Sequence, residues 1–406
     1  MDDSAAIWAA YEAAAAPLIA TPAGLPAPGR IPPREWLYGT RLLRRFVSVL
    51  VAPGGVGKSA YALAQALALA TGRPILAEAV HHRVNAWVLN LEDPMDELDR
   101  RVAALMIRHR IAPEEVAGRL FLHSGRARRV TMATEGPSGR IVHPDKPGLI
   151  AAARAASIGL ITIDPFVKSH GLDENANREM DAAATAWAEV AEETGAAVQL
   201  VHHVRKPPAG TTAVADIDAA RGAKALTDAA RVGLVMSTMS EEEAAALNVP
   251  PTERWRHVRL DDAKANMAPR AERARWFRLE SIALHNATGA YPHGDNVAAL
   301  APWSPPSPFA GLGPEQCNDA LDRIAAGPAE GVLFAARRGG LGTARWAGRV
   351  LMDGFGVAES QAAAVIAAWL KSGLLEEAEY RDPGQRKTRL GVRVNDEKRP
   401  TAGNFT

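Results

Sequence analysis

The sequence lacks the features that mark secreted or membrane-bound proteins. Its 406 residues contain one cysteine, Cys317, which excludes an internal disulfide framework and fits a reducing compartment. The first residues, Met1-Asp2-Asp3-Ser4, are acidic where a secretory signal would be basic. Even the apolar run 60–71 is too short to span a bilayer, and Gln65 interrupts it. We therefore expect a cytoplasmic protein with no membrane partner.

An excess of charge of one sign is absent too. The chain has 47 basic and 46 acidic residues, a net charge of +1, so any basic surface for nucleic acid has to be local. The content of 47% hydrophobic and 23% charged residues is ordinary for a soluble globular protein. The length is sufficient for more than one domain.

From Trp36 onward, short β runs alternate with longer helical patterns. Strands separated by helices predict βαβ units and an α/β fold with a doubly wound, mainly parallel sheet that carries helices on both faces. The expected strands are residues 45–51, 85–91, 120–123, 160–163 and 197–202, and then 232–237, 255–260 and 275–282. The expected helices of this region are residues 59–71, 94–109, 148–157 and 177–194.

Proline-rich stretches divide the chain. Residues 1–35 combine a short helix at 4–20 with a proline-rich arm, and that helix packs either on its own core or on a neighbouring subunit. The α/β core then covers residues 36–290, and residues 291–313 predict a linker. Three helical patterns and a hairpin at 314–395 have the layout of a small winged helix, with a flexible tail at 396–406.

A Walker A phosphate loop lies between the first strand and the first helix of the core. Glycines let backbone N–H groups curl around phosphates, and the following helix presents its positive end to them. Lys58 is expected to reach the β- and γ-phosphates of ATP, and the Ser59 hydroxyl to bind Mg²⁺. The predicted ATP-binding residues are Gly54, Gly55, Val56, Gly57, Lys58, Ser59 and Ala60.

Two carboxylates are candidates for the remaining chemistry. Asp164 ends an apolar strand in the Walker B arrangement and is the second Mg²⁺-side residue. Pro165 follows it, so a catalytic base cannot stand there. Glu92 ends the second strand and would face the nucleotide crevice as the base, although a Glu-Asp-Pro sequence also suits a helix start with Asp93 as its cap.

Further motifs follow in a specific order. They are a histidine pair at 202–203, the run ARGAKALTDAAR at 220–231, and the run DAKAN at 262–266. With the P-loop and a base on the second strand, this succession resembles the RepA-type hexameric replicative helicases of the RecA/DnaB superfamily, over about residues 36–285. The resemblance implies a RecA-like, AAA-related ATPase core that assembles into a homo-hexamer or another ring.

The resemblance also implies three site roles. His203 would sense the γ-phosphate, Arg231 would be an arginine finger acting in the adjacent subunit, and Lys264 would be a second trans-acting cation at the nucleotide. From the residues alone, His203 could instead be a strand-end histidine bonded to backbone, and Arg231 and Lys264 could each be surface charges.

The loops after Asp164 and after His203 are long and polar. In the superfamily such loops grip single-stranded DNA, and Lys168, Arg205 and Lys206 are placed for phosphate contact; ordinary solvated loops are the alternative. In the C-terminal hairpin, Arg386 and Lys387 belong to a basic wing. Such a wing suits duplex DNA, and winged helices also dock proteins.

These features predict an ATP-hydrolysing DNA helicase or translocase of plasmid, phage or mobile-element replication. Its predicted cofactors are ATP and Mg²⁺, and its main predicted partner is single-stranded DNA. An ATP-switched regulator or loader that clamps DNA without unwinding shares every motif. A small-substrate P-loop kinase fits less well, because Arg231 would then have no role.

Overall fold

The computed structural model describes residues 19–204, 223–247, 249–271, 273–339, 344–384 and 386–401. The chain divides into a unit of residues 1–35 and a unit of residues 36–406. In the first unit the described residues 19–35 are exposed and contain one 3-10 turn, η1 (Pro28–Arg30). The helix expected at 4–20 lies almost wholly outside the described residues.

A nine-stranded sheet forms the centre of the second unit, in the order β13-β12-β11-β10-β3-β9-β8-β4-β5. The strands from β10 to β5 are parallel to one another, and β11, β12 and β13 continue the sheet as antiparallel strands. The parallel strands are β3 (Val47–Pro53), β4 (Asn85–Asn90), β5 (Leu120–Ser124), β8 (Ile158–Asp164), β9 (Ala197–Val204) and β10 (Val232–Thr238). The antiparallel strands are β11 (His257–Ala265), β12 (Arg275–Ala283) and β13 (Asn296–Trp303).

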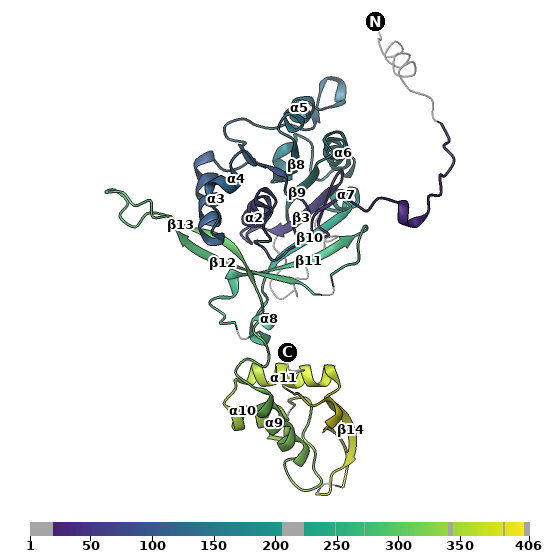
Figure 1. Cartoon of the computed structure of the whole chain (residues 1–406), viewed down its shortest axis with the longest axis vertical. Helices are drawn as coiled ribbons and strands as arrows, with labels where there is room; N and C mark the ends of the chain where they lie inside the picture. The colour runs from purple at the N-terminus through teal and green to yellow at the C-terminus, as the bar shows by residue number, and fades with distance from the viewer. Residues whose placement is uncertain are drawn as a thin grey trace. The chain divides into compact units, whose positions relative to one another are not determined.

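Helices cover both faces of this sheet (Figure 1). In β3, Leu50 and Ala52 belong to the core on one face, whereas Val49 and Val51 belong to the core on the other, because successive side chains of a strand alternate. The first face packs against α2 (Lys58–Thr71), α3 (Met95–His109) and α4 (Pro113–Val116). The second packs against α5 (Lys146–Ala155), α6 (Asn177–Thr194) and α7 (Ala223–Ala229).

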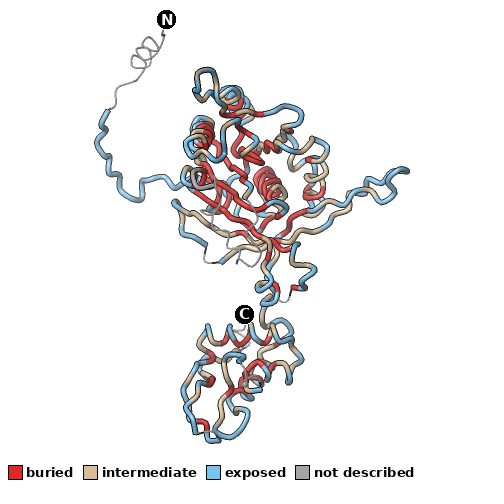
Figure 2. Tube along the Cα trace, turned by 180° about the vertical axis from the view of Figure 1, so that it is seen from behind, coloured by how far each residue is buried: buried red, intermediate tan, exposed pale blue. Residues whose placement is uncertain are grey.

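The central strands are buried along their length, as Figure 2 shows. All seven residues of β3 and all seven of β8 are buried, which explains why both read as continuous apolar runs in the sequence. The expected α/β fold class, a mainly parallel sheet with helices on both faces, is confirmed.

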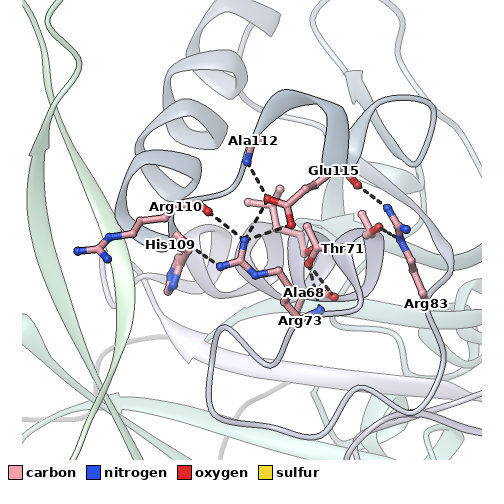
Figure 3. Close-up of polar contacts among 10 residues, drawn as sticks. Ala68, Thr71, Arg73, Arg83, His109, Arg110, Ala112 and Glu115 are labelled. Atoms are coloured by element: carbon pink, nitrogen blue, oxygen red, sulfur yellow. Dashed lines mark hydrogen bonds and ion pairs between the residues drawn. The ribbon is translucent and has the colours of Figure 1, made fainter.

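Two arginines, Arg73 and Arg83, connect the end of α2 to the ends of α3 and α4 (Figure 3). Gly72 ends α2 with a left-handed backbone, φ 76°, which suits glycine. The Arg73 guanidinium donates to the carbonyls of His109 and Arg110 at 2.8 and 3.0 Å and to the Glu115 carboxylate at 3.1 Å. These contacts satisfy helix-end carbonyls and fix α2, which follows the phosphate loop, against its neighbours.

Short elements complete this part of the chain. They are β1 (Trp36–Tyr38), β2 (Leu42–Leu43), β6 (Thr134–Glu135), β7 (Ile141–Val142), α8 (Glu241–Ala246) and the 3-10 turns η2 (Pro137–Gly139), η3 (Phe166–Ser169) and η5 (Arg254–Arg256). No helix among the described residues is both long and apolar enough to cross a membrane.

The C-terminal part of the chain has a hydrophobic core of its own, made of residues between Leu312 and Val394. Its elements are α9 (Pro314–Ala326), α10 (Gly348–Phe355), α11 (Glu359–Ser372), β14 (Leu375–Arg381), β15 (Thr388–Val394) and the turn η7 (Asp396–Lys398). The order of three helices and a hairpin is the one expected, and the winged-helix assignment stays a prediction.

One expectation needs correction. The segment 291–313, expected to be a linker, contains β13, which pairs with β12 over its whole length, from Trp276 opposite Trp303 to Ala283 opposite Asn296. Ala299, Leu300 and Ala301 are fully buried. Burial of these apolar side chains favours a strand here, although the surrounding prolines had predicted a linker.

Candidate nucleotide site

The phosphate loop connects β3 directly to α2. Gly55 and Gly57 adopt φ values of 81° and 103°, in the left-handed region that favours glycine. A Cβ at Gly57 would also come within 3.3 Å of the Leu279 side chain on β12. The chain thus turns tightly from a buried strand into a helix N-terminus, the geometry that turns backbone N–H groups toward a phosphate.

Lys58, the first residue of α2, is held inside this loop. Its Nζ donates to the carbonyl oxygens of Ala52 and Pro53 at 2.9 and 2.7 Å. Burial lowers the pKa of Lys58 to about 8, and the nearby carboxylates of Asp164 and Glu92 act in the opposite direction. The ammonium therefore lies close to the loop and to both candidate carboxylates.

Ser59 and Asp164 form the candidate Mg²⁺ pair. The Asp164 carboxyl ends β8, is buried and shares a hydrogen bond with the Ser59 side chain. Burial raises the pKa of Asp164, while Ser59, His203 and Lys58 favour its charged form. A hydroxyl and a carboxylate beside the phosphate loop are the oxygen ligands that Mg²⁺ prefers, so these residues fit the metal.

Glu92 lies at the same edge of the sheet. It follows β4, whose last residue, Asn90, pairs with Asp164 of β8, and its carboxylate interacts electrostatically with Lys58, Asp164 and His203. The alternative in which Asp93 caps the next helix does not describe the structure. Asp93 binds the Asn90 side chain at 3.1 Å and Arg101 at 2.9 Å, while Pro94 is the capping residue of α3.

Two residues that the sequence analysis did not single out fix the backbone at Glu92. The Asn90 Oδ1 accepts hydrogen bonds from the N–H groups of Glu92 and Asp93 at 3.0 and 2.8 Å. Arg126, which follows β5, donates from Nε to the Glu92 carbonyl at 2.7 Å. Asn90 could have been found as a polar residue ending an apolar strand, whereas Arg126 gives no signal because its partner is a main-chain atom 34 residues away.

The histidine pair ends β9, beside β3. His203 pairs with Ala52 in the sheet register, and its side chain reaches solvent. Its ring is partly covered, and this partial burial, followed by the nearby Lys58, lowers its pKa. His202 points to the other face, is 5% exposed, and burial lowers its pKa to about 4. The two residues therefore differ, and His203 is the one that interacts with the charged groups of the site.

Arg231 and Lys264 lie at the opposite edge of the sheet. The Arg231 N–H donates to the carbonyl of Val47, the first residue of β3, and its side chain is exposed. The phosphate loop leaves the other end of β3, about 20 Å away at the rise of a strand. Lys264 pairs with Gly233 in the register and donates from Nζ to the carbonyls of Thr227 and Asp228 at the end of α7.

The predicted DNA contacts are distributed over three places. Lys168 is exposed in η3, just after Asp164, on the same edge of the sheet as the phosphate loop. Arg205 and Lys206 lie outside the described residues. Arg386 and Lys387 are exposed between β14 and β15. Nearer the base of that hairpin, Glu376 pairs with Arg393. The buried Asp382 lies in the same connection as Arg386 and Lys387, and it binds Arg345 and Arg389.

The site therefore has the parts of a P-loop ATPase: a glycine phosphate loop, a buried lysine, and a serine–aspartate pair at neighbouring strand ends. A family described as an AAA domain matches residues 13–209 of the chain. Among solved structures, the chain is similar to one described as the crystal structure of the RadB recombinase. The two are 12% identical, the match covers 59% of this chain and 89% of that chain, and the TM-score is 0.37.

Proposed function

We propose that the protein is an ATP-dependent DNA helicase or translocase of plasmid, phage or mobile-element replication. It hydrolyses ATP at the subunit interfaces of a ring and moves on single-stranded DNA. The proposal rests on the P-loop ATPase site and on the order of motifs that resembles the RepA-type helicases.

The proposal that the chain forms a ring rests on the distance between Arg231 and the phosphate loop of the same chain. Arg231 is exposed at the start of β10, and the whole length of β3 lies between it and the loop of its own chain. An arginine that contacts the γ-phosphate therefore has to do so in another copy of the chain.

Within one site, each residue has a separate role in ATP hydrolysis. Lys58 binds and orients the phosphates, and Mg²⁺, held by Ser59 and Asp164, supplies charge stabilisation when bound. Glu92 accepts a proton from the attacking water, which forms a bond to the γ-phosphorus as the bond to the β,γ-bridging oxygen breaks. His203, at the end of β9, reports the state of the γ-phosphate to the segment that follows.

The DNA contacts follow from the sheet topology. The segments after β8 and β9 leave the same edge of the sheet as the phosphate loop, so changes at the nucleotide are close to both. Lys168 is in the first of these segments.

The testing experiment is steady-state ATPase activity with and without single-stranded DNA, combined with native mass and a strand-displacement assay. A ring with DNA-stimulated turnover and strand displacement supports the proposal. Nucleotide-dependent DNA retention without displacement would instead support the clamp or loader. A monomer with full activity at every concentration would exclude the ring.

A further inference from the structure

A small pocket lies beside the catalytic edge of the sheet. It has a volume of about 250 Å³ and is lined by Leu91, Gly125, Arg129, Val130 and Lys168. Leu91 precedes Glu92 in the segment after β4, Gly125 to Val130 follow β5, and Lys168 follows β8. Three strand ends therefore contribute to one pocket.

The pocket carries two available positive charges. Within the residues that the structure describes, neither Arg129 nor Lys168 makes an ion pair or a side-chain hydrogen bond, and both are exposed. None of the lining residues is acidic. Two unpaired cations on the wall of one pocket suit an anion, and an arginine with a lysine suits a phosphate in particular.

The segment that presents Arg129 is well ordered by its neighbours. Arg128 binds Asp145 at 2.5 Å, and His123 contacts the Arg128 carbonyl at 2.7 Å. Gly125 donates to the Asn90 carbonyl at 2.8 Å, and a Cβ there would come within 2.6 Å of the Leu91 backbone. Arg128 is thus neutralised within the fold, whereas Arg129, the next residue, is left to face the pocket.

We propose that this pocket binds a backbone phosphate of single-stranded DNA, with Arg129 and Lys168 as its contacts. The inference rests on the proposed function, because it adds a DNA subsite to the same edge of the sheet. The volume is below the range of about 300–1,000 Å³ that is typical of small-molecule sites, so it suits a phosphodiester group better than a whole nucleotide.

The segment after β5, which presents Arg129 to the pocket, also contacts the backbone of the proposed catalytic base, Glu92. Arg126 holds the Glu92 carbonyl, and Leu91 is a wall of the pocket. A phosphate in this pocket would therefore contact the segment of Arg126 and Arg129, and Leu91, which directly precedes Glu92. This arrangement gives DNA a direct route to the ATPase site, independent of the segment after β9.

The test is fluorescence anisotropy with labelled oligo-dT over a salt series. Arg129→Ala and Lys168→Ala should each reduce the slope of log K against log salt by about 0.7, and the double variant by about 1.4. Arg129→Lys keeps the charge and should retain the slope. Arg140→Ala, which removes an exposed arginine that does not line the pocket, is the matched control and should leave the slope unchanged.

The outcomes separate this inference from the proposed function. If the wild-type protein binds no single-stranded DNA, both fail. If it binds DNA and Arg129→Ala retains the full slope, the pocket is not a DNA subsite and the proposed function stands. If the variants instead weaken binding of a fluorescent ATP analogue with the DNA slope intact, the phosphate belongs to a nucleotide, which also overturns the inference.

Discussion

The two edges of the parallel sheet differ in how their charged residues are held. At the carboxyl edge, the charged residues lie at the ends of different strands or just after them, and they interact electrostatically with one another; they are Lys58, Glu92, Asp164 and His203. Burial shifts the pKa of Lys58, Asp164 and His203. At the amino edge, the Arg231 side chain is exposed and Lys264 binds the end of a helix.

This difference shows which functions one chain can supply by itself. The carboxyl edge assembles the phosphate loop, the candidate Mg²⁺ ligands and the candidate base within a single chain. The amino edge holds charges that cannot reach that site across the length of β3. A role for Arg231 in hydrolysis therefore requires a second subunit.

The largest expected effect is at Arg231. Arg231→Ala should bind ATP nearly normally and hydrolyse it about 10³- to 10⁵-fold more slowly, because an arginine finger stabilises charge that develops at the γ-phosphate. The measurement is steady-state ATPase activity, with binding of a fluorescent ATP analogue measured in parallel.

Mixing two inactive proteins sharpens this test. Lys58→Ala lacks the phosphate-binding lysine and Arg231→Ala lacks the finger, so mixed rings contain some interfaces with both groups intact, and activity should partly return. Mixed assemblies that are verified by native mass and remain inactive would show that Arg231 acts within its own chain or in the fold.

A somewhat smaller effect is expected at the carboxyl edge. Glu92→Gln should leave ATP binding intact and lower turnover about 10²- to 10⁴-fold, the usual contribution of a general base. Asp96→Asn is the matched control, since Asp96 is an exposed acid that pairs with Arg100 on α3. Turnover of Glu92→Gln near that of the wild type would remove Glu92 from the mechanism.

The fold was largely predictable because its signals are local. The expected helix at 177–194 agrees with α6 to the residue. The expected strand at 255–260 differs, because Arg254–Arg256 form a 3-10 turn and the strand continues to Ala265. β13 was missed because its pairing partner, β12, and not its local sequence, determines its conformation.

The site was predictable where residues follow strand ends. Lys58, Asp164 and Glu92 come together because parallel strands end at one edge. The contacts of Arg126 and Arg129 were not predictable, since the run GRARR at 125–129 does not reveal which arginine binds a carbonyl and which faces a pocket. The contact between Lys264 and α7 depends in the same way on the antiparallel register of β10 and β11.

The pH dependence of nucleotide binding should report on Lys58. Its pKa of about 8 means that the nucleotide-free protein loses this charge above that pH, so binding then requires uptake of a proton. The apparent Kd for an ATP analogue should be flat below pH 8 and rise about tenfold per pH unit above it. Lys58→Arg, which keeps its charge, should not show the rise.

Rising pH should weaken nucleotide binding at Lys58 but should stabilise the folded chain. Between pH 8 and 10.5 the unfolded chain binds a proton at Lys58 that the folded chain has lost, so this group makes the free energy of unfolding increase with pH over that window. Thermal unfolding without nucleotide, compared between wild type and Lys58→Arg, measures this difference. A pH dependence that is identical in the two proteins would assign it to other groups.

The smallest effect is expected at Lys264, where the amino edge is held by a contact within the chain. Lys264→Met keeps the aliphatic stem and removes two hydrogen bonds to the last carbonyls of α7, so the free energy of unfolding should fall by about 0.3–1 kcal/mol. ATPase activity should fall far less than in Arg231→Ala, because Lys264 supports the helix that precedes the finger. A loss as large as that of Arg231→Ala, with unchanged thermal unfolding, would instead show that Lys264 also reaches a neighbour's nucleotide.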